Sequence, residues 1–348
     1  MHVAHLELPQ RRSWYPALAR AILALMSLLV PPVWPAATAS GSEQTARYAG
    51  WAVEAYPELS AQDMVAMVSR LADNGANVVW IGHNNPGVVD RDKVEPGLSY
   101  AVYEAYVDAA DPRHEAAAAV VAAQRRMLVA CRTVGLKAVL PVGYQIQMGR
   151  RWNETHPDHL RLDAQGGPLD IYGGGVSASF YSPIYRSDIE AYYRWLDAEF
   201  VDPYRDVILM LNLADEPLGG DYSPLADAEF RARHGFGLQE AGDDAWRQRL
   251  VGAFQSRYVV EYATYSARLW ASIRPGLPVT MSFDGAQARQ TWTMPDVEAL
   301  FRDTPANFVV TFDAYPRDGL PRVGLSDGDL GGLVIALDDG RRVDVLLD

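Results

Sequence analysis

Short apolar runs alternate along the chain with longer segments that have the spacing of an amphipathic helix. The apolar runs are typical of β-strands and cover residues 48–56, 77–84, 137–147, 207–216, 278–284, 307–315 and 342–348. The segments of helical spacing cover residues 60–74, 115–134, 187–200, 244–273 and 294–303. Because strand and helix alternate without hairpin signals between them, the pattern predicts a parallel sheet with crossover helices.

Small or polar side chains recur at every second position of several predicted strands, so that they share one face of the strand, here called one parity. The set is Gly50, Ala52 and Glu54; Asn212, Ala214 and Glu216; Thr280, Ser282 and Asp284; and Thr311, Asp313 and Tyr315. A strand buried on both faces is apolar on both, so a polar parity indicates a lumen that opens at the carboxyl ends. This is the arrangement of a (β/α) barrel with its active site at the C-terminal face. An open nucleotide-binding sheet is not supported, because no glycine-rich phosphate motif is present.

The first 39 residues have the pattern of a secretory signal. Arg11, Arg12 and Arg20 precede the apolar run 21–30, and a small-x-small cleavage site follows at residues 37–39. The apolar run is roughly half of what spans a bilayer, which favours a cleaved signal over an anchor. We therefore expect a signal peptide over residues 1–39 and a barrel over residues 45–348. The product would be secreted or periplasmic, with no membrane insertion after cleavage.

The composition of the chain restricts the classes of partner and ligand that we expect it to bind. The chain has 31 Lys and Arg against 44 Asp and Glu, a net charge of −13, which is a poor match for nucleic acid. The single cysteine, Cys131, can form no internal disulfide. No pair of cysteines or histidines has metal-ligand spacing, so we expect neither a metal nor another cofactor.

The run 207–217 carries the most informative chemistry, because a predicted buried strand ends there in Asp215, Glu216 and Pro217. A carboxyl that leaves an apolar strand is partly desolvated, which raises its pKa and allows it to act as a general acid near neutral pH. The alternative is a polar turn in which Asp215 caps a helix that begins at Pro217. That alternative leaves the lumen parity unexplained, so we interpret Glu216 as the catalytic candidate.

At this strand end the sequence resembles the retaining glycoside hydrolase clan built on (β/α)8 barrels, and most of all the family 42 β-galactosidase group. The resemblance is carried by Glu216–Ser223, Ala228–Gly235 and Phe312–Pro316. It implies a TIM-type barrel that cleaves O-glycosidic bonds by double displacement, with Glu216 as acid/base. Asp215 stands where the clan has an asparagine that binds the sugar 2-hydroxyl. The cysteine cluster that binds zinc in some members is absent.

The clan's nucleophile is a glutamate at the end of strand seven, and this chain offers no clear counterpart. We interpret residues 332–348 as the end of a helix followed by a seventh strand that ends at Asp348, with no eighth strand. The barrel is therefore expected to be incomplete at its C-terminus, and turnover by the chain as given is expected to be weak or absent. Two functions remain: a retaining glycosidase, and a carbohydrate-binding barrel that does not turn over.

Residues at several predicted strand ends are candidates for sugar contacts. The candidates are Asn212, Asp215, His83, Asn84, Gln145, Asp284 and Asp313 for hydroxyl groups, and Tyr144, Trp292 and Tyr315 for stacking on sugar faces. Trp80, Trp152 and Tyr172 occupy similar positions. For each ring, packing in the core is the alternative.

Overall fold

The structure is a computed structural model that describes residues 48–82, 97–143, 148–169, 176–215, 217, 219–284, 297–313, 333–337 and 342–347. At 284, 297–298, 312–313, 333–337 and 342–347 only the backbone is described. The expected signal peptide, residues 1–39, lies outside these ranges.

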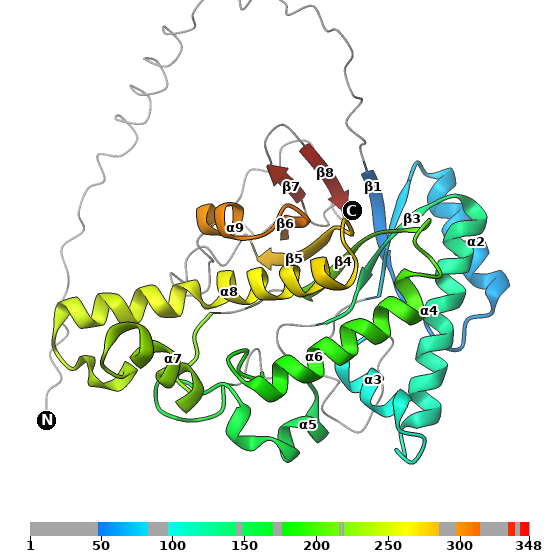
Figure 1. Cartoon of the computed structure of the whole chain (residues 1–348). Coiled ribbons are helices and arrows are strands. Elements are labelled where there is room, and N and C mark those ends of the chain that lie inside the picture. The colour runs from blue at the N-terminus through cyan, green and yellow to red at the C-terminus, as the bar shows by residue number, and fades with distance from the viewer. Residues whose placement is uncertain are drawn as a thin grey trace, which may run out of the picture. The chain divides into compact units, whose positions relative to one another are not determined.

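The described strands form a closed barrel in chain order (Figure 1). They are β1 (Tyr48–Val53), β2 (Val78–Ile81), β3 (Lys137–Pro141), β4 (Ile208–Asp215), β5 (Val279–Asp284), β6 (Phe308–Asp313), β7 (Leu333–Leu337) and β8 (Arg342–Leu347). Neighbours from β1 to β6 pair in parallel, and so do β1 and β8, whereas β7 is antiparallel to both of its neighbours. The predicted parallel α/β architecture is confirmed for the first six strands.

Helices connect the parallel strands on the outside of the barrel. They are α2 (Ala61–Asp73), α3 (Tyr100–Val107), α4 (His114–Val134), α5 (Arg150–Thr155), α6 (Pro183–Leu196), α7 (Pro224–His234), α8 (Ala245–Ile273) and α9 (Val297–Asp303). A π-helical turn, Asp197–Val201, extends α6, and 3-10 turns occur at Pro157–His159 and Leu238–Ala241. The sequence pattern predicted α2, α4, α6, α8 and α9, but not the shorter helices α3, α5 and α7.

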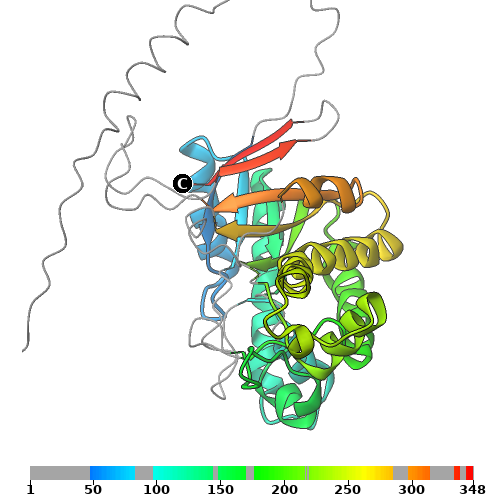
Figure 2. The same cartoon turned by 90° about the vertical axis from the view of Figure 1, so that its left-hand side faces the viewer.

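The C-terminal segment corrects the sequence interpretation. The strands β7 and β8 pair as an antiparallel hairpin, and β8 then pairs with β1, so the expected absence of an eighth strand is wrong (Figure 2). A short apolar run such as Leu333–Leu337 cannot be told from a buried helix segment by periodicity alone, which explains the error. The (β/α)8 repeat is nevertheless incomplete, because a hairpin stands where two parallel strands would.

The two parities of the strands face different surroundings, as the sequence predicted. Leu211, Leu213 and Met281 belong to the main core with the helices, whereas Val78, Val139 and Met210 belong to a separate small cluster. On this second parity the polar residues bond to one another: Asn212 Nδ2 donates to Ser282 Oγ at 3.2 Å, and Thr280 Oγ1 donates to Thr311 Oγ1 at 3.0 Å. The polar parity therefore lines the lumen.

Candidate active site at the barrel mouth

The carboxyl ends of β1 to β6 meet at one mouth, because these strands run in the same direction. At this edge the backbone of Asp284 pairs in register with that of Asp313, and Asp215 pairs with Ser282. Glu54 directly follows β1 at the same end. The mouth thus carries acidic positions from β1, β4, β5 and β6. The strand parity predicted those of β1, β5 and β6, whereas on β4 it predicted Glu216 rather than Asp215.

The pairing register of β4 with β5 shifts just before the end of β4, an irregularity of the kind that a β-bulge produces and that is called the bulge below. Asn212 pairs with Thr280, yet the next pair joins Asp215 to Ser282, so three steps along β4 match two along β5. The extra residue brings Asp215 to the register position of Ser282, on the lumen parity. Bulges are common next to active sites, where they re-aim side chains. The simple alternation that assigned Glu216 to the lumen therefore does not extend past Leu213.

Several predicted site residues lie outside the described residues. These are His83, Asn84, Tyr144, Gln145, Glu216, Trp292 and Tyr315. Glu216 is bracketed by Asp215, the last residue of β4, and by the buried Pro217. Its role stays a prediction. For Asp284 and Asp313 the backbone register is described, and their sugar contacts also stay predictions.

Asn212 lies deeper in the lumen than the other candidates. Its side chain is fully buried and donates to Ser282, and its Oδ1 atom has no hydrogen-bond partner among the described residues. Thr280 and Thr311 are buried beside this pair. Asn212 is thus part of the polar floor beneath the mouth, and a contact with a sugar stays a prediction for it.

Two of the aromatic side chains at strand ends belong to the core. Trp80 is 9% exposed and packs in the lumen cluster with Val78 and Met210. Trp152 is 1% exposed, and its Nε1 donates to Asp188 Oδ2 at 2.7 Å. For these two rings the packing alternative is confirmed. Tyr172 lies outside the described residues.

The connection from β4 to α7, which follows Glu216 in the chain, is held by a buried arginine. Arg161 is 0% exposed and donates from Nη2 to the carbonyl of Gly219 at 2.9 Å. It also donates from Nε to the carbonyl of Gly220 at 3.0 Å. Its guanidinium lies over the Tyr258 ring, 4.6 Å from the centroid. The planar fork of arginine can satisfy two adjacent carbonyls at once.

Asp221, the next residue along, fixes the same connection from its other side. Its Oδ2 accepts from Ser179 Oγ at 2.6 Å, and its Oδ1 accepts from the Ser223 amide at 2.8 Å. Gln255 of α8 bonds both main-chain groups of Asp221, at 2.6 Å to the amide and 2.8 Å to the carbonyl. Burial raises the pKa of the Asp221 carboxyl, and the nearby Arg161 charge opposes that rise.

Arg161 and Asp221 were missed by the sequence analysis. Arg161 stands between two leucines, Leu160 and Leu162, and nothing in that local pattern indicates a partner 58 positions away. Asp221 lies in the segment Glu216–Ser223, which the sequence analysis used only for its resemblance to the family 42 group. Long-range pairing of this kind has no periodic signal in a single sequence.

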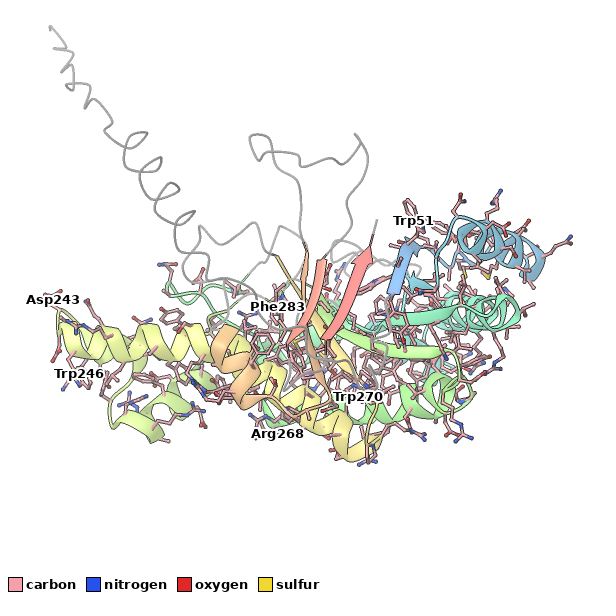
Figure 3. All side chains as sticks on the ribbon, turned by 90° about the horizontal axis from the view of Figure 1, so that it is seen from above. Trp51, Asp243, Trp246, Arg268, Trp270 and Phe283 are labelled. Atoms are coloured by element: carbon pink, nitrogen blue, oxygen red, sulfur yellow. The ribbon has the colours of Figure 1, made fainter. Side chains whose placement is uncertain are left out.

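The outer surface carries one described hollow that is separate from the mouth. It encloses about 860 Å³ and is lined from α6, α8 and α9 by side chains that include Arg186, Arg257, Arg268 and Asp303. None of its lining residues comes from a strand, so the hollow belongs to the helix layer. Figure 3 shows the same separation of helices and strands: Asp243 and Trp246 lie at the N-terminal end of α8, away from the strands, and Phe283 lies among the strands.

Two classes of site find no support within the described residues. They contain no group of three or more His, Cys, Asp or Glu side chains that could hold a metal ion. They also contain no helix that is long and apolar enough to cross a membrane.

No protein-family model and no curated protein sequence matches the chain. Solved structures do match. The β-galactosidase from the Antarctic haloarchaeon Halorubrum lacusprofundi aligns with a TM-score of 0.55 and 17% identity, over 79% of this chain and 41% of that chain. The cold-adapted β-galactosidase from Rahnella sp. R3 aligns with a TM-score of 0.55 and 13% identity, over 81% of this chain and 41% of that chain.

A GH42 β-galactosidase from G. stearothermophilus gives a TM-score of 0.53 and 14% identity, over 81% of this chain and 41% of that chain. The chain shares the barrel fold of these β-galactosidases. It spans less than half the length of each, and at such identity the likeness establishes the fold alone. The predicted TIM-type architecture, incomplete at its C-terminal end, is confirmed.

Proposed function

We propose that this chain acts on O-glycosidic bonds at the acidic mouth of its barrel, by retaining double displacement with Glu216 as general acid/base. The observation that supports this most is the end of β4. The bulge brings Asp215 to the lumen register opposite Ser282, and the next residue along the chain is Glu216. The alternative, in which Asp215 caps a helix that begins at Pro217, finds no support, because the helix after β4 begins at Pro224 and is capped by Ser223.

The chemistry would divide into two steps. In the first, a carboxylate attacks the anomeric carbon while Glu216 donates its proton to the leaving oxygen, and a covalent glycosyl-enzyme forms. In the second, Glu216, now ionised, takes a proton from water, and the resulting hydroxide displaces the enzyme carboxylate. An ionised Asp215 beside Glu216 would favour the protonated state of Glu216 before the first step.

The carboxylate that attacks is unassigned among Glu54, Asp284, Asp313 and Asp348. A retaining pair requires carboxyl groups about 5 to 5.5 Å apart, whereas an inverting pair lies about 6.5 to 9.5 Å apart. Glu54 follows β1 and the two aspartates end β5 and β6, all at the mouth. Asp348 directly follows β8, which runs parallel to β1 and so toward the same end.

The substrate class follows from the resemblance and from the names of the structural neighbours, which are β-galactosidases. We propose a β-galactoside or a related β-glycoside. The secretory pattern of residues 1–39 adds the proposal that the enzyme works outside the cytoplasm, on an extracellular or periplasmic glycoside.

The test replaces Glu216 by glutamine and compares two leaving groups. On an alkyl β-galactoside, whose leaving oxygen needs a proton, Glu216→Gln should lower kcat/KM by roughly 10² to 10⁴. On an aryl β-galactoside whose phenolate leaves unaided, the first step should be largely spared. Equal losses on both substrates would contradict the assignment of Glu216.

A carbohydrate-binding barrel without turnover is the second candidate, and one observation favours it. The strand β7 is antiparallel to β6, so its carboxyl end at Leu337 points away from the mouth. A nucleophile at the end of β7, as in the clan, would lie at the wrong face. Titration calorimetry with galactose and lactose distinguishes the candidates. Binding of either sugar by a wild-type protein that hydrolyses neither the alkyl nor the aryl β-galactoside would support the binding barrel.

A further inference from the structure

We infer that Arg161 is a positioning residue for the general acid: by holding the carbonyls of Gly219 and Gly220, it fixes the chain that follows Glu216. This inference rests on the proposed function and deepens it, because it names the group that would keep the acid in place. Arg161 itself is buried and is not offered as a contact of the substrate.

The first argument concerns the partners of the Arg161 guanidinium. A fully buried arginine usually pairs with a carboxylate, because an isolated buried charge is costly. Arg161 lies near the Asp221 carboxylate, and its guanidinium also donates to two consecutive main-chain carbonyls. Gly220 has φ of 89°, a backbone conformation that favours glycine. The guanidinium therefore stabilises one specific turn, three to four residues after Glu216 in the chain.

The second argument is that the turn is held from several independent elements. Asp221 is tied to Ser179 and to Gln255 of α8, and Ser223 caps α7 through the amide of Ala226 at 3.3 Å. On the other side of Glu216, the bulge of β4 is paired with β5. Glu216 is thus flanked by a strand end and by a fixed turn, with only Pro217 and Leu218 between it and the turn.

The third argument is that a fixed turn keeps a proton donor in position. A displacement of about 1 Å in a catalytic group can lower the rate by roughly 10²-fold. Without the guanidinium, the carbonyls of Gly219 and Gly220 would lose their hydrogen-bond donor, and the connection between β4 and α7 would rearrange to expose them to water. On the proposed function, a general acid held next to this turn would then be misplaced and more solvated, and greater solvation favours the ionised form of a carboxyl, which lowers its pKa.

The experiment uses Arg161→Lys, which keeps the positive charge but cannot supply the planar fork. Arg132→Lys is the matched control. Arg132 donates from Nη2 to the carbonyl of Pro203 at 2.7 Å and from Nε to Asp206 Oδ2 at 2.8 Å, so it holds the chain where it enters β4 rather than where it leaves. A core variant, Leu128→Ala in α4, serves as a control for lost stability alone.

For Arg161→Lys we expect kcat/KM on an alkyl β-galactoside to fall roughly 10- to 100-fold and kcat/KM on an activated aryl β-galactoside, which reports the first step alone, to fall less than about threefold. The alkaline limb of the alkyl pH profile, which reports loss of the acid's proton, should move to lower pH. Amide hydrogen exchange over residues 213–223 should quicken. Both controls should leave the ratio of the two rates and the alkaline limb unchanged.

Equal losses on both glycosides with an unmoved alkaline limb would overturn the inference, as would unchanged exchange over residues 213–223. A wild-type chain that hydrolyses neither glycoside, with Glu216→Gln equally inert, would instead refute the proposed function and with it the positioning role. Hydrogen exchange then shows separately whether Arg161 still fixes the turn, so the two failures are distinguishable.

Discussion

Replacing Asp221 by alanine removes the acceptor at the centre of the fixed β4–α7 connection. In the wild type this buried carboxylate accepts from Ser179 Oγ at 2.6 Å and from the Ser223 amide at 2.8 Å. Each buried donor left without a partner costs about 1–3 kcal/mol. The two together predict that Asp221→Ala lowers the free energy of unfolding by about 2–6 kcal/mol.

Asp206→Ala is the contrasting variant, because Asp206 pairs with Arg132 at the surface. The Asp206 side chain is 58% exposed, and exposed ion pairs contribute about 0–1 kcal/mol. Urea unfolding followed by tryptophan fluorescence measures both variants at the same pH. A loss for Asp221→Ala as small as that for Asp206→Ala would refute the claim that buried hydrogen bonds fix this connection. Asp221→Asn, which keeps an acceptor oxygen, should lose less than Asp221→Ala.

Three further outcomes follow from the structure. First, Glu54, Asp284, Asp313 and Asp348 are replaced singly by their amides, and one of the four variants should lose turnover of aryl and alkyl glycosides alike. Failure of every amide variant to abolish turnover would contradict the assignment of the nucleophile to this set. Second, hydrogen bonds from Arg113, with further support from Arg151, hold the pKa of the Asp111 carboxyl below its ordinary value. The difference in free energy of unfolding between wild type and Asp111→Asn should therefore be full above about pH 4 and shrink as the pH falls further, which urea unfolding from pH 7 to pH 2 checks. Third, Thr311→Val should be destabilising by about 1–3 kcal/mol, because it removes the partner of Thr280 in the buried lumen, and an unchanged urea midpoint would contradict that.

The strand parity predicted much of the fold because it depends on burial, which every strand residue experiences. Leu211 and Met281 pack toward the helices and Asn212 and Thr280 face the lumen, as the alternation indicated. The parallel direction of the first six strands then brings Asp284 and Asp313 to one mouth without further information.

What the sequence did not predict depends on pairing between distant segments. The bulge before Asp215 is a mismatch between β4 and β5, and neither strand alone contains it. The hairpin of β7 and β8 replaces a helix-like interpretation of the Leu333–Leu337 run. Arg161 reaches carbonyls that lie 58 and 59 positions away, and a charged residue between two leucines carries no sign of that partner.

The most direct test of the proposed double displacement is the anomeric configuration of the first sugar released from an aryl β-galactoside, followed by proton NMR before mutarotation and at high enzyme concentration. Two displacements at the anomeric carbon predict that the β-anomer appears first. First appearance of the α-anomer would contradict the account, because it would mean a single displacement by water across a wider pair of carboxylates.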